Sequence, residues 1–321
     1  MSMNNEAFKQ IHSVFVLCDD SGSMKEGDGK LVSGQRCSRL DEQSETIENI
    51  VRVVQKDGVP TTFKFLNGDV EYQSDNLEGI KAANYVKGGT PLCSNITNYI
   101  SKVTTMLPEL RESDKKMVLV IITDGEATDG NLLSAMQPLK DLPVRVVLRL
   151  VTDSSIIVSY WNYIDDNLNI DFDTIDDFQS ESKEIHIKNP WLSYTFDFHI
   201  LRILGAFSPA VFHDLDITCG NLIDYLDERP LTLKEIICFS VFYLGGTIKD
   251  HPTDLAGLCS YFNKYESNIK VFSLFKNRQQ RIVLPNKIWK YYSPIPIGFM
   301  SSIFPSYYRH SIEKTWLANN R

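Results

Sequence analysis

The sequence lacks the long apolar runs that would make it a membrane-spanning protein. No apolar run approaches the roughly 20 residues that a transmembrane helix needs. The longest runs, at residues 236–245 and 144–151, are typical of buried core segments. The first ten residues also lack the apolar segment of a signal peptide. The sequence therefore predicts an intracellular protein, cytoplasmic or nuclear, with no membrane span.

Cysteine is sparse and unpaired in the sequence. The six cysteines are scattered at positions 18, 37, 93, 219, 238 and 259. No two of them form a C-x-x-C pair, which argues against a zinc ribbon or a thioredoxin-like redox motif. Cys18 and Cys238 lie in apolar runs, where cysteine behaves as a small core residue. Without a secretion signal, reduced thiols are the simplest interpretation.

Common catalytic signatures are missing as well. The chain has no G-x-S-x-G, no phosphate-binding loop with Gly-Lys-Ser/Thr and no G-x-G-x-x-G. Its six histidines show neither H-x-x-x-H nor H-E-x-x-H spacing. The pattern predicts that the protein is not an enzyme, and a metal-dependent hydrolase is the less favoured alternative.

The most informative stretch is a short apolar run that ends in carboxylates and hydroxyls. Residues 13–17 have the β-branched and aromatic composition of a strand buried on both faces. Asp19, Ser21 and Ser23 follow at alternate positions just past its end. Ligands bind at this edge of open α/β sheets, and carboxylate and hydroxyl oxygens suit Mg²⁺, Mn²⁺ or Ca²⁺ rather than zinc. An ordinary polar turn that caps a helix would give the same pattern.

Two further segments carry similar chemistry. Residues 88–92 place the hydroxyl of Thr90 in a glycine-rich loop ahead of a helix-period stretch. Residues 117–125 form a second apolar run that ends in the carboxylate of Asp124. The three segments, D-x-S-x-S, then Thr, then T-D-G, resemble the metal-ion-dependent adhesion site of the von Willebrand factor A (vWA) family. They occur in the order that the family has.

This resemblance extends over roughly residues 10 to 207. It implies one Mg²⁺ or Mn²⁺ surrounded by Asp19, Ser21, Ser23, Thr90 and Asp124. In the family, the hydroxyls usually contact the metal directly, and the carboxylates contact it directly or through water. One coordination position is left for an acidic group. The implied function is metal-dependent protein binding, in which an Asp or Glu of a partner completes the site.

Other polar residues lie close to these segments. The side chain of Asp20 is expected to point away from those of its neighbours. Glu126 and Asp129 would either tune the electrostatics of the metal or, as we favour, cap the helix that begins at Asn131. Cys93 is expected to contribute to packing rather than to chemistry.

Hydrophobic periodicity predicts strands that alternate with helices. Strands are expected at 13–18, 61–66, 117–123 and 144–151, with an antiparallel edge strand at 70–72 and a possible sixth strand at 170–175. Helices are expected at 38–56, 96–107, 131–142 and 155–168. Residues 25–37, rich in Gly, Lys and Ser, are expected to form an exposed loop. This alternation predicts an α/β fold with a doubly wound, mostly parallel sheet.

The length of 321 residues suits two domains. We expect a metal-binding domain at 10–207 and a smaller, mostly helical domain of unknown role at 208–321. Residues 264–321 hold ten Lys and Arg against two Glu, a charge near +8. The net charge of the whole chain is −8, so the other residues together carry about −16. Basic residues beside aromatics offer an alternative function, the binding of nucleic acid or an anionic surface. Buried aromatics with solvated charges are the simpler interpretation.

Overall fold

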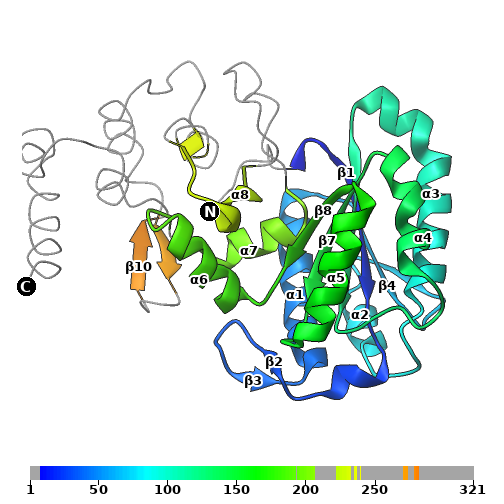
Figure 1. Ribbon diagram of the computed structural model, residues 1–321, viewed down its shortest axis with the longest axis horizontal. Helices are drawn as coiled ribbons and strands as arrows, with labels where there is room; N and C mark the ends of the chain where they lie inside the picture. The colour runs from blue at the N-terminus through cyan, green and yellow to red at the C-terminus, as the bar shows by residue number, and fades with distance from the viewer. Residues whose placement is uncertain are drawn as a thin grey trace, which may run out of the picture. The chain divides into compact units, whose positions relative to one another are not determined.

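The computed structural model (Figure 1) describes residues 8–192, 194–206, 222–232, 235, 236 and 239, and the backbone alone of residues 270–273 and 278–281. Two strands of the last part, β9 (Lys270–Ser273) and β10 (Arg278–Arg281), pair antiparallel. Most of the predicted helical domain at 208–321 lies outside the described residues, so its fold stays a prediction.

A six-stranded sheet forms the centre of the fold, in the order β5-β4-β1-β6-β7-β8. Every neighbouring pair is parallel except β4 and β5, which form the expected antiparallel hairpin. The strands are β1 (Ile11–Cys18), β4 (Thr61–Phe65), β5 (Glu71–Gln73), β6 (Lys116–Thr123), β7 (Val144–Leu150) and β8 (Asp171–Ile175). The prediction of a mostly parallel, doubly wound α/β sheet is confirmed.

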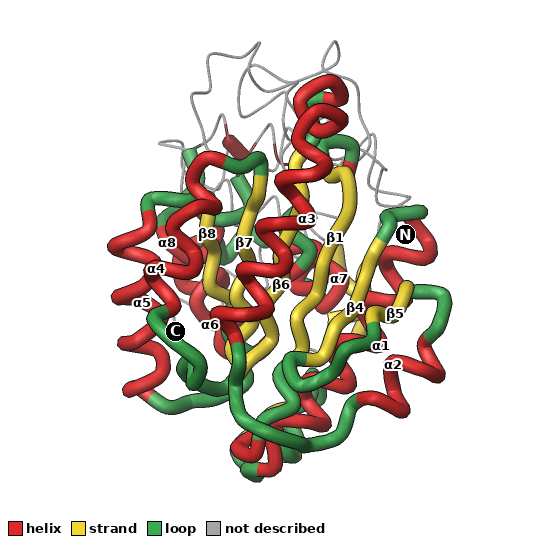
Figure 2. The backbone as a smooth tube through the Cα atoms, turned by 90° about the vertical axis from the view of Figure 1, so that its right-hand side faces the viewer, coloured by secondary structure: helices red, strands yellow, loops and turns green. Residues whose placement is uncertain are grey.

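Helices cover both faces of this sheet (Figure 2). Helices α3, α4 and α5 lie on one face, and α1 and α7 lie on the other. The helices are α1 (Arg39–Asp57), α2 (Leu77–Ala83), α3 (Leu92–Ser113), α4 (Leu132–Met136), α5 (Ser155–Leu168), α6 (Phe178–Lys188), α7 (Phe196–Ile203) and α8 (Tyr225–Glu228). The predicted helix at 131–142 is split into α4 and a 3₁₀ helix, Gln137–Asp141, because Pro138 has no N–H to continue the α-helical pattern.

The core explains why these segments form these elements. Strands β1, β6 and β7 have almost uninterrupted buried residues, as strands covered on both faces do. One core cluster packs Ile96 and Tyr99 of α3 and Trp161 of α5 against the sheet. Helix α1 begins at a capping box between Ser38 and Asp41 and ends at a left-handed glycine after Asp57. The sheet is thus packed between helices, and the loops at its edge begin from buried strands.

Residues 25–37 differ from the expected exposed loop. After a 3₁₀ helix (Gly22–Lys25), two short strands, β2 (Gly29–Lys30) and β3 (Arg36–Cys37), pair antiparallel. The backbone N–H of Lys30 donates to Glu42 of α1 at 2.7 Å, and the N–H of Val32 donates to Glu45 at 2.7 Å. Long-range bonds to α1, which the local composition does not reveal, therefore order this segment. We call residues 26–38 the β2–β3 segment.

The chain divides into two compact units. One contains Ser2–Glu184 with Thr195–Tyr225, and the other contains Ile185–Tyr194 with Leu226–Arg321. The sheet lies in the first unit. The expected domain boundary between 207 and 208 stays a prediction. Within the described parts of the chain, no helix has both the length and the apolar character needed to cross a membrane.

Candidate metal centre

The predicted site lies where the order of the strands reverses. From β1 the chain continues to β4 on one side, whereas from β6 it continues to β7 on the other side. The carboxyl ends of β1 and β6 therefore meet at a topological switch point, the place where open α/β sheets bind ligands. Ser23, after β1, donates a hydrogen bond from Oγ to Oδ1 of Asp124, after β6, at 2.8 Å. The fold thus brings two of the three predicted segments into direct contact.

Asp19 is a fully buried carboxylate that is fixed on both oxygens. Its Oδ1 accepts the backbone N–H of Ser21 at 2.8 Å, and its Oδ2 accepts the hydroxyl of Thr123 at 2.5 Å. Burial raises the pKa of Asp19 to about 6 in spite of these hydrogen bonds. Within the described part of the chain, Asp19 makes no ion pair. A buried carboxylate without a cation is the environment that a bound metal ion would stabilise.

The two serine hydroxyls lie beside this carboxylate. Ser21 Oγ and Ser23 Oγ are 3.1 Å apart. Ser21 occupies the N-cap of the 3₁₀ helix, but its side chain makes no capping hydrogen bond there. The cap of the next helix, α1, is Ser38. The alternative of a simple helix-capping turn therefore does not account for these hydroxyls.

Thr90 reaches the same edge from the loop before α3. Its N–H donates to Thr128 Oγ1 at 3.0 Å, and its carbonyl accepts the N–H of Thr128 at 2.9 Å. A methyl group added at Gly125, the residue after Asp124, would lie 3.9 Å from Thr90 Oγ1. The Thr90 hydroxyl therefore lies beside the residue that follows Asp124, at the same edge of the sheet as the segments after β1 and β6.

Asp129 has a capping role at a different helix from the one expected. Its carboxylate accepts the backbone N–H groups of Cys93 and Ser94 at 2.9 Å each, at the start of α3. The N-cap of α3 is Pro91, which offers no side-chain hydrogen bond. Helix α4 is capped instead by Asn131 itself. The expectation that Asp129 caps the helix at Asn131 was wrong, because the loop after β6 folds onto α3.

Asp20 directs its carboxylate away from the cluster. Its Oδ1 accepts the backbone N–H of Asn67 at 3.0 Å and the side-chain amide of Asn67 at 2.7 Å. Its Oδ2 is 3.8 Å from the ammonium of Lys87. Asp20 therefore connects the end of β1 to the turn between β4 and β5. Its side chain points away from those of Asp19 and Ser21, as the sequence predicts.

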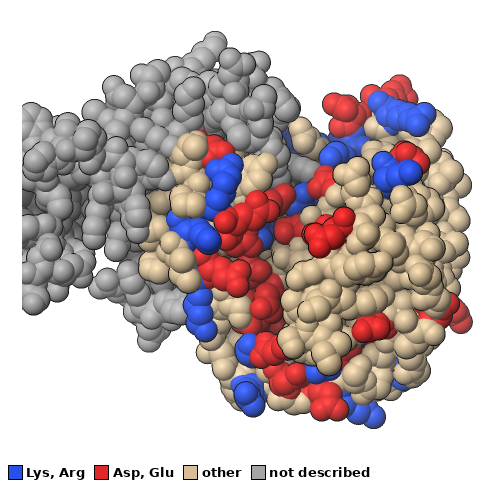
Figure 3. Space-filling model, viewed as in Figure 1, with Lys and Arg blue, Asp and Glu red and all other residues tan. Residues whose placement is uncertain are grey.

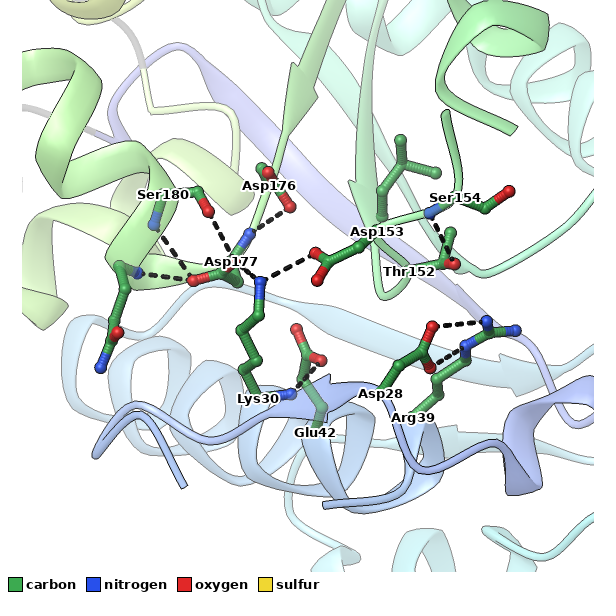
Figure 4. Close-up of polar contacts among 12 residues, drawn as sticks. Asp28, Lys30, Arg39, Glu42, Thr152, Asp153, Ser154, Asp176, Asp177 and Ser180 are labelled. Carbon is green, nitrogen blue, oxygen red and sulfur yellow. Dashed lines mark hydrogen bonds and ion pairs between the residues drawn. The ribbon is translucent and has the colours of Figure 1, made fainter. Parts of the chain in front are cut away.

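The edge also contains a cation that the sequence did not predict. Arg39, the first residue of α1, donates from Nη1 to Asp124 Oδ2 at 2.8 Å. Its Nε and Nη2 bind the two oxygens of Asp28 at 2.6 and 2.8 Å, a pair that Figure 4 shows. No local pattern could reveal this contact, since Arg39 and Asp124 lie 85 residues apart in the chain.

A second acidic group lies nearby, at the ends of β7 and β8. Carboxylate oxygens of Asp153, Asp176 and Asp177 lie within 4.8 Å of one another. The ammonium of Lys30, from the β2–β3 segment, binds Asp153 at 2.8 Å and Asp177 at 3.0 Å (Figure 4). On the face in Figure 3, acidic side chains gather beside α5, over β8 and the start of α6. This group already contains a cation, and sequence reasoning missed it.

The chemistry of the first cluster suits a hard divalent ion. Its donors are the oxygens of two carboxylates and three hydroxyls, from Asp19, Ser21, Ser23, Thr90 and Asp124. Such donors favour Mg²⁺ or Mn²⁺ over softer metals. Because Asp19 is buried without a cation, the residues present fit such an ion.

These features define an α/β domain with an oxygen-rich cluster at its switch point. Residues 13–153 match the family model of the von Willebrand factor type A domain. This match is shorter than the expected region of roughly 10 to 207, and it contains all five residues of the cluster. A comparison with curated proteins found no match to the sequence.

Several solved structures resemble part of the chain. The VWA domain of SpRpn10 is 12% identical, with a TM-score of 0.38, and the match covers 52% of this chain and 88% of that domain. BatB from Bacteroides thetaiotaomicron is 14% identical, with a TM-score of 0.40 and coverage of 60% and 99%. An aerotolerance-related membrane protein from Bacteroides fragilis is 16% identical, with a TM-score of 0.38 and coverage of 52% and 93%.

Proposed function

We propose that the domain is a metal-dependent protein-binding module. The cluster at the carboxyl ends of β1 and β6 would hold Mg²⁺ or Mn²⁺ through Asp19, Ser21, Ser23, Thr90 and Asp124. The observation that carries this proposal is the contact between Ser23 and Asp124, which joins two sequence-distant parts of the motif within a match to the von Willebrand factor type A domain. The function is binding without catalytic turnover, and the partner is a protein that offers an Asp or Glu.

Each residue would have a distinct part in the site. The bound ion would supply an electrophilic position for a partner's carboxylate. Asp19 contributes a buried negative charge whose orientation Thr123 and Ser21 fix beforehand. The hydroxyls of Ser21 and Ser23 bridge from Asp19 towards Asp124. Because the hydroxyls carry no charge, they would leave the ion short of negative ligands, which favours an acidic partner.

The first test is metal binding by Asp19→Asn, measured by titration calorimetry with Mg²⁺ and Mn²⁺ on the full chain. We expect affinity to fall by more than roughly tenfold, since even residues that only orient metal ligands have effects of that size. Asp20→Asn is the matched control: the same change is made one residue away, on a carboxylate that binds Asn67 instead. Circular dichroism checks that both variants fold. Equal metal affinity in the wild type and Asp19→Asn would refute the assigned site.

A further inference from the structure

All three nitrogens of the Arg39 guanidinium bind carboxylates, and these belong to two residues. Two of its nitrogens bind Asp28, and the third, Nη1, binds Asp124. The Arg39 side chain is 12% exposed, and that of Asp124 is fully buried. The attraction within an ion pair that is shielded from water is screened less than that within a pair on the surface. Arg39 therefore places a positive charge directly on a carboxylate of the proposed metal cluster.

The backbone around Arg39 holds the guanidinium in place. Arg39 directly follows Ser38, whose side chain and that of Asp41 form the capping box of α1. The N–H of Arg39 donates to the carbonyl of Glu26 at 3.0 Å. At Gly29, an added Cβ would lie only 2.7 Å from the carbonyl oxygen of Ser38, so the β2–β3 segment passes very close to the start of the helix. The guanidinium is thus positioned by α1 and by the β2–β3 segment together.

Both oxygens of Asp124 are already engaged in this arrangement. Oδ1 accepts the hydroxyl of Ser23, and Oδ2 accepts the guanidinium of Arg39. A divalent ion bound at the cluster would have to share the negative charge of Asp124 with Arg39, and it would be repelled by the guanidinium. The two cations therefore oppose each other at one carboxylate.

We propose that Arg39 is a built-in competitor of the divalent ion for Asp124 and sets the metal affinity of the cluster. This inference rests on the proposed metal site and adds a regulating residue to it. Because linkage is reciprocal, metal binding weakens the contact between Arg39 and Asp124 by the same free energy by which that contact weakens metal binding. Loading of the site is thereby coupled to the β2–β3 segment, which helps to hold the guanidinium.

The test compares Mg²⁺ and Mn²⁺ affinity in the wild type, Arg39→Gln and Arg36→Gln, by calorimetry on the full chain. We expect Arg39→Gln to bind the ions at least roughly tenfold more tightly, a typical size for a coupling between two sites. Arg36→Gln removes the same charge from β3, in an exposed residue, and should bind metal as the wild type does. Tighter binding in Arg39→Gln alone supports the proposal.

Other outcomes separate the two hypotheses. Equal affinity in the wild type and Arg39→Gln overturns the competition but leaves the metal site intact. Absence of binding in every variant overturns the proposed function and the competition with it. A second measurement uses the wild type alone, so it does not depend on whether Arg39→Gln folds. The NMR signal of the Arg39 side-chain Nε–H, assigned by its loss in Arg39→Lys, should shift when Mg²⁺ is added. A signal that does not move while metal binds would contradict the proposal.

Discussion

The Asp177 side chain shows how one buried carboxylate is kept charged in this fold. Burial raises its pKa, but hydrogen bonds from Ser180 and Lys30 outweigh that effect and lower the pKa to about 2. The folded-state pKa therefore lies below the ordinary value for Asp of about 3.9. The resulting stabilisation is present above that ordinary value, and it is lost as the pH falls through about 2.

The corresponding prediction concerns Asp177→Asn. At neutral pH the free energy of unfolding of the variant should be on the order of 2 kcal/mol lower than that of the wild type. This difference should shrink as the pH is lowered from about 5 towards 2. Urea unfolding at a series of pH values measures it. Asp153→Asn is the control, because it removes the more exposed partner of Lys30 and should cost less. A difference that does not change with pH would contradict the ion-pair explanation.

At the level of single residues, the sequence was informative only where a motif is local. The carboxylate and hydroxyl pattern after β1, and the carboxylate after β6, could be read directly because each stands within a few residues of a strand end. Arg39 and Lys30 could not. Lys30 binds Asp153 and Asp177, which are 123 and 147 residues away in the chain. Such contacts follow from the fold and have no signature in the neighbouring sequence.

Helix α3 illustrates what an element needs besides periodicity. Its N-terminus lacks a capping side chain of its own, and Asp129 from the loop after β6 supplies the missing acceptor. This loop also binds Thr90 through Thr128. The same interactions therefore stabilise α3 and fix the loop that carries Thr90.

We predict that Asp129→Ala destabilises the protein by about 1 kcal/mol, the usual cost of losing a helix cap. The two N–H groups at the start of α3 lose their acceptor, and only water can replace it. Chemical denaturation measures the change. Glu126→Ala, an exposed residue of the same loop, is the control and should have little effect. Equal stability in the wild type and Asp129→Ala would show that the cap does not contribute.

Elements with a clear period were predictable, and irregular ones were not. The apolar spacing in α1 and α5 gave helices whose positions are confirmed. Helix α2 and the strands β2 and β3 were missed, since each is short and depends on tertiary contacts. The helix predicted at 96–107 is longer in the structure, where α3 begins at Leu92 and continues past Pro108 to Ser113. Helix α3 thus contains Pro108 in spite of the backbone hydrogen bond that a proline removes.

At the scale of the whole molecule, the two candidate modes of binding, to a protein through the metal and to nucleic acid through basic residues, belong to different parts of the chain. The first unit carries the proposed metal cluster, whereas the basic residues concentrate at 264–321. These basic side chains lie outside the described residues, so the nucleic-acid alternative stays a prediction, as do the expected cellular location and the helical second domain.

The two modes respond differently to salt and to chelator. A protein partner held through the metal should be released by EDTA and by Asp19→Asn. Nucleic acid bound by the basic segment should survive EDTA and weaken steeply as salt rises. Capture on the immobilised full chain, with Mg²⁺ or EDTA and over a range of salt, distinguishes them. A bound protein that is retained equally in EDTA and by Asp19→Asn would contradict binding through the cluster.

The central position of β1 has a consequence for how the chain reaches its native state. β1 is the earliest strand of the sheet along the chain, yet Phe15 is flanked by Thr62 on one side and Leu119 on the other. A nascent chain would therefore carry an apolar strand with both edges open until β4 has been synthesised, and with one edge open until β6 follows. Pairings this distant in sequence slow folding, and open apolar edges promote aggregation in the meantime. The cluster at the end of β1 can form only after β6 has joined β1, because Asp124 follows β6.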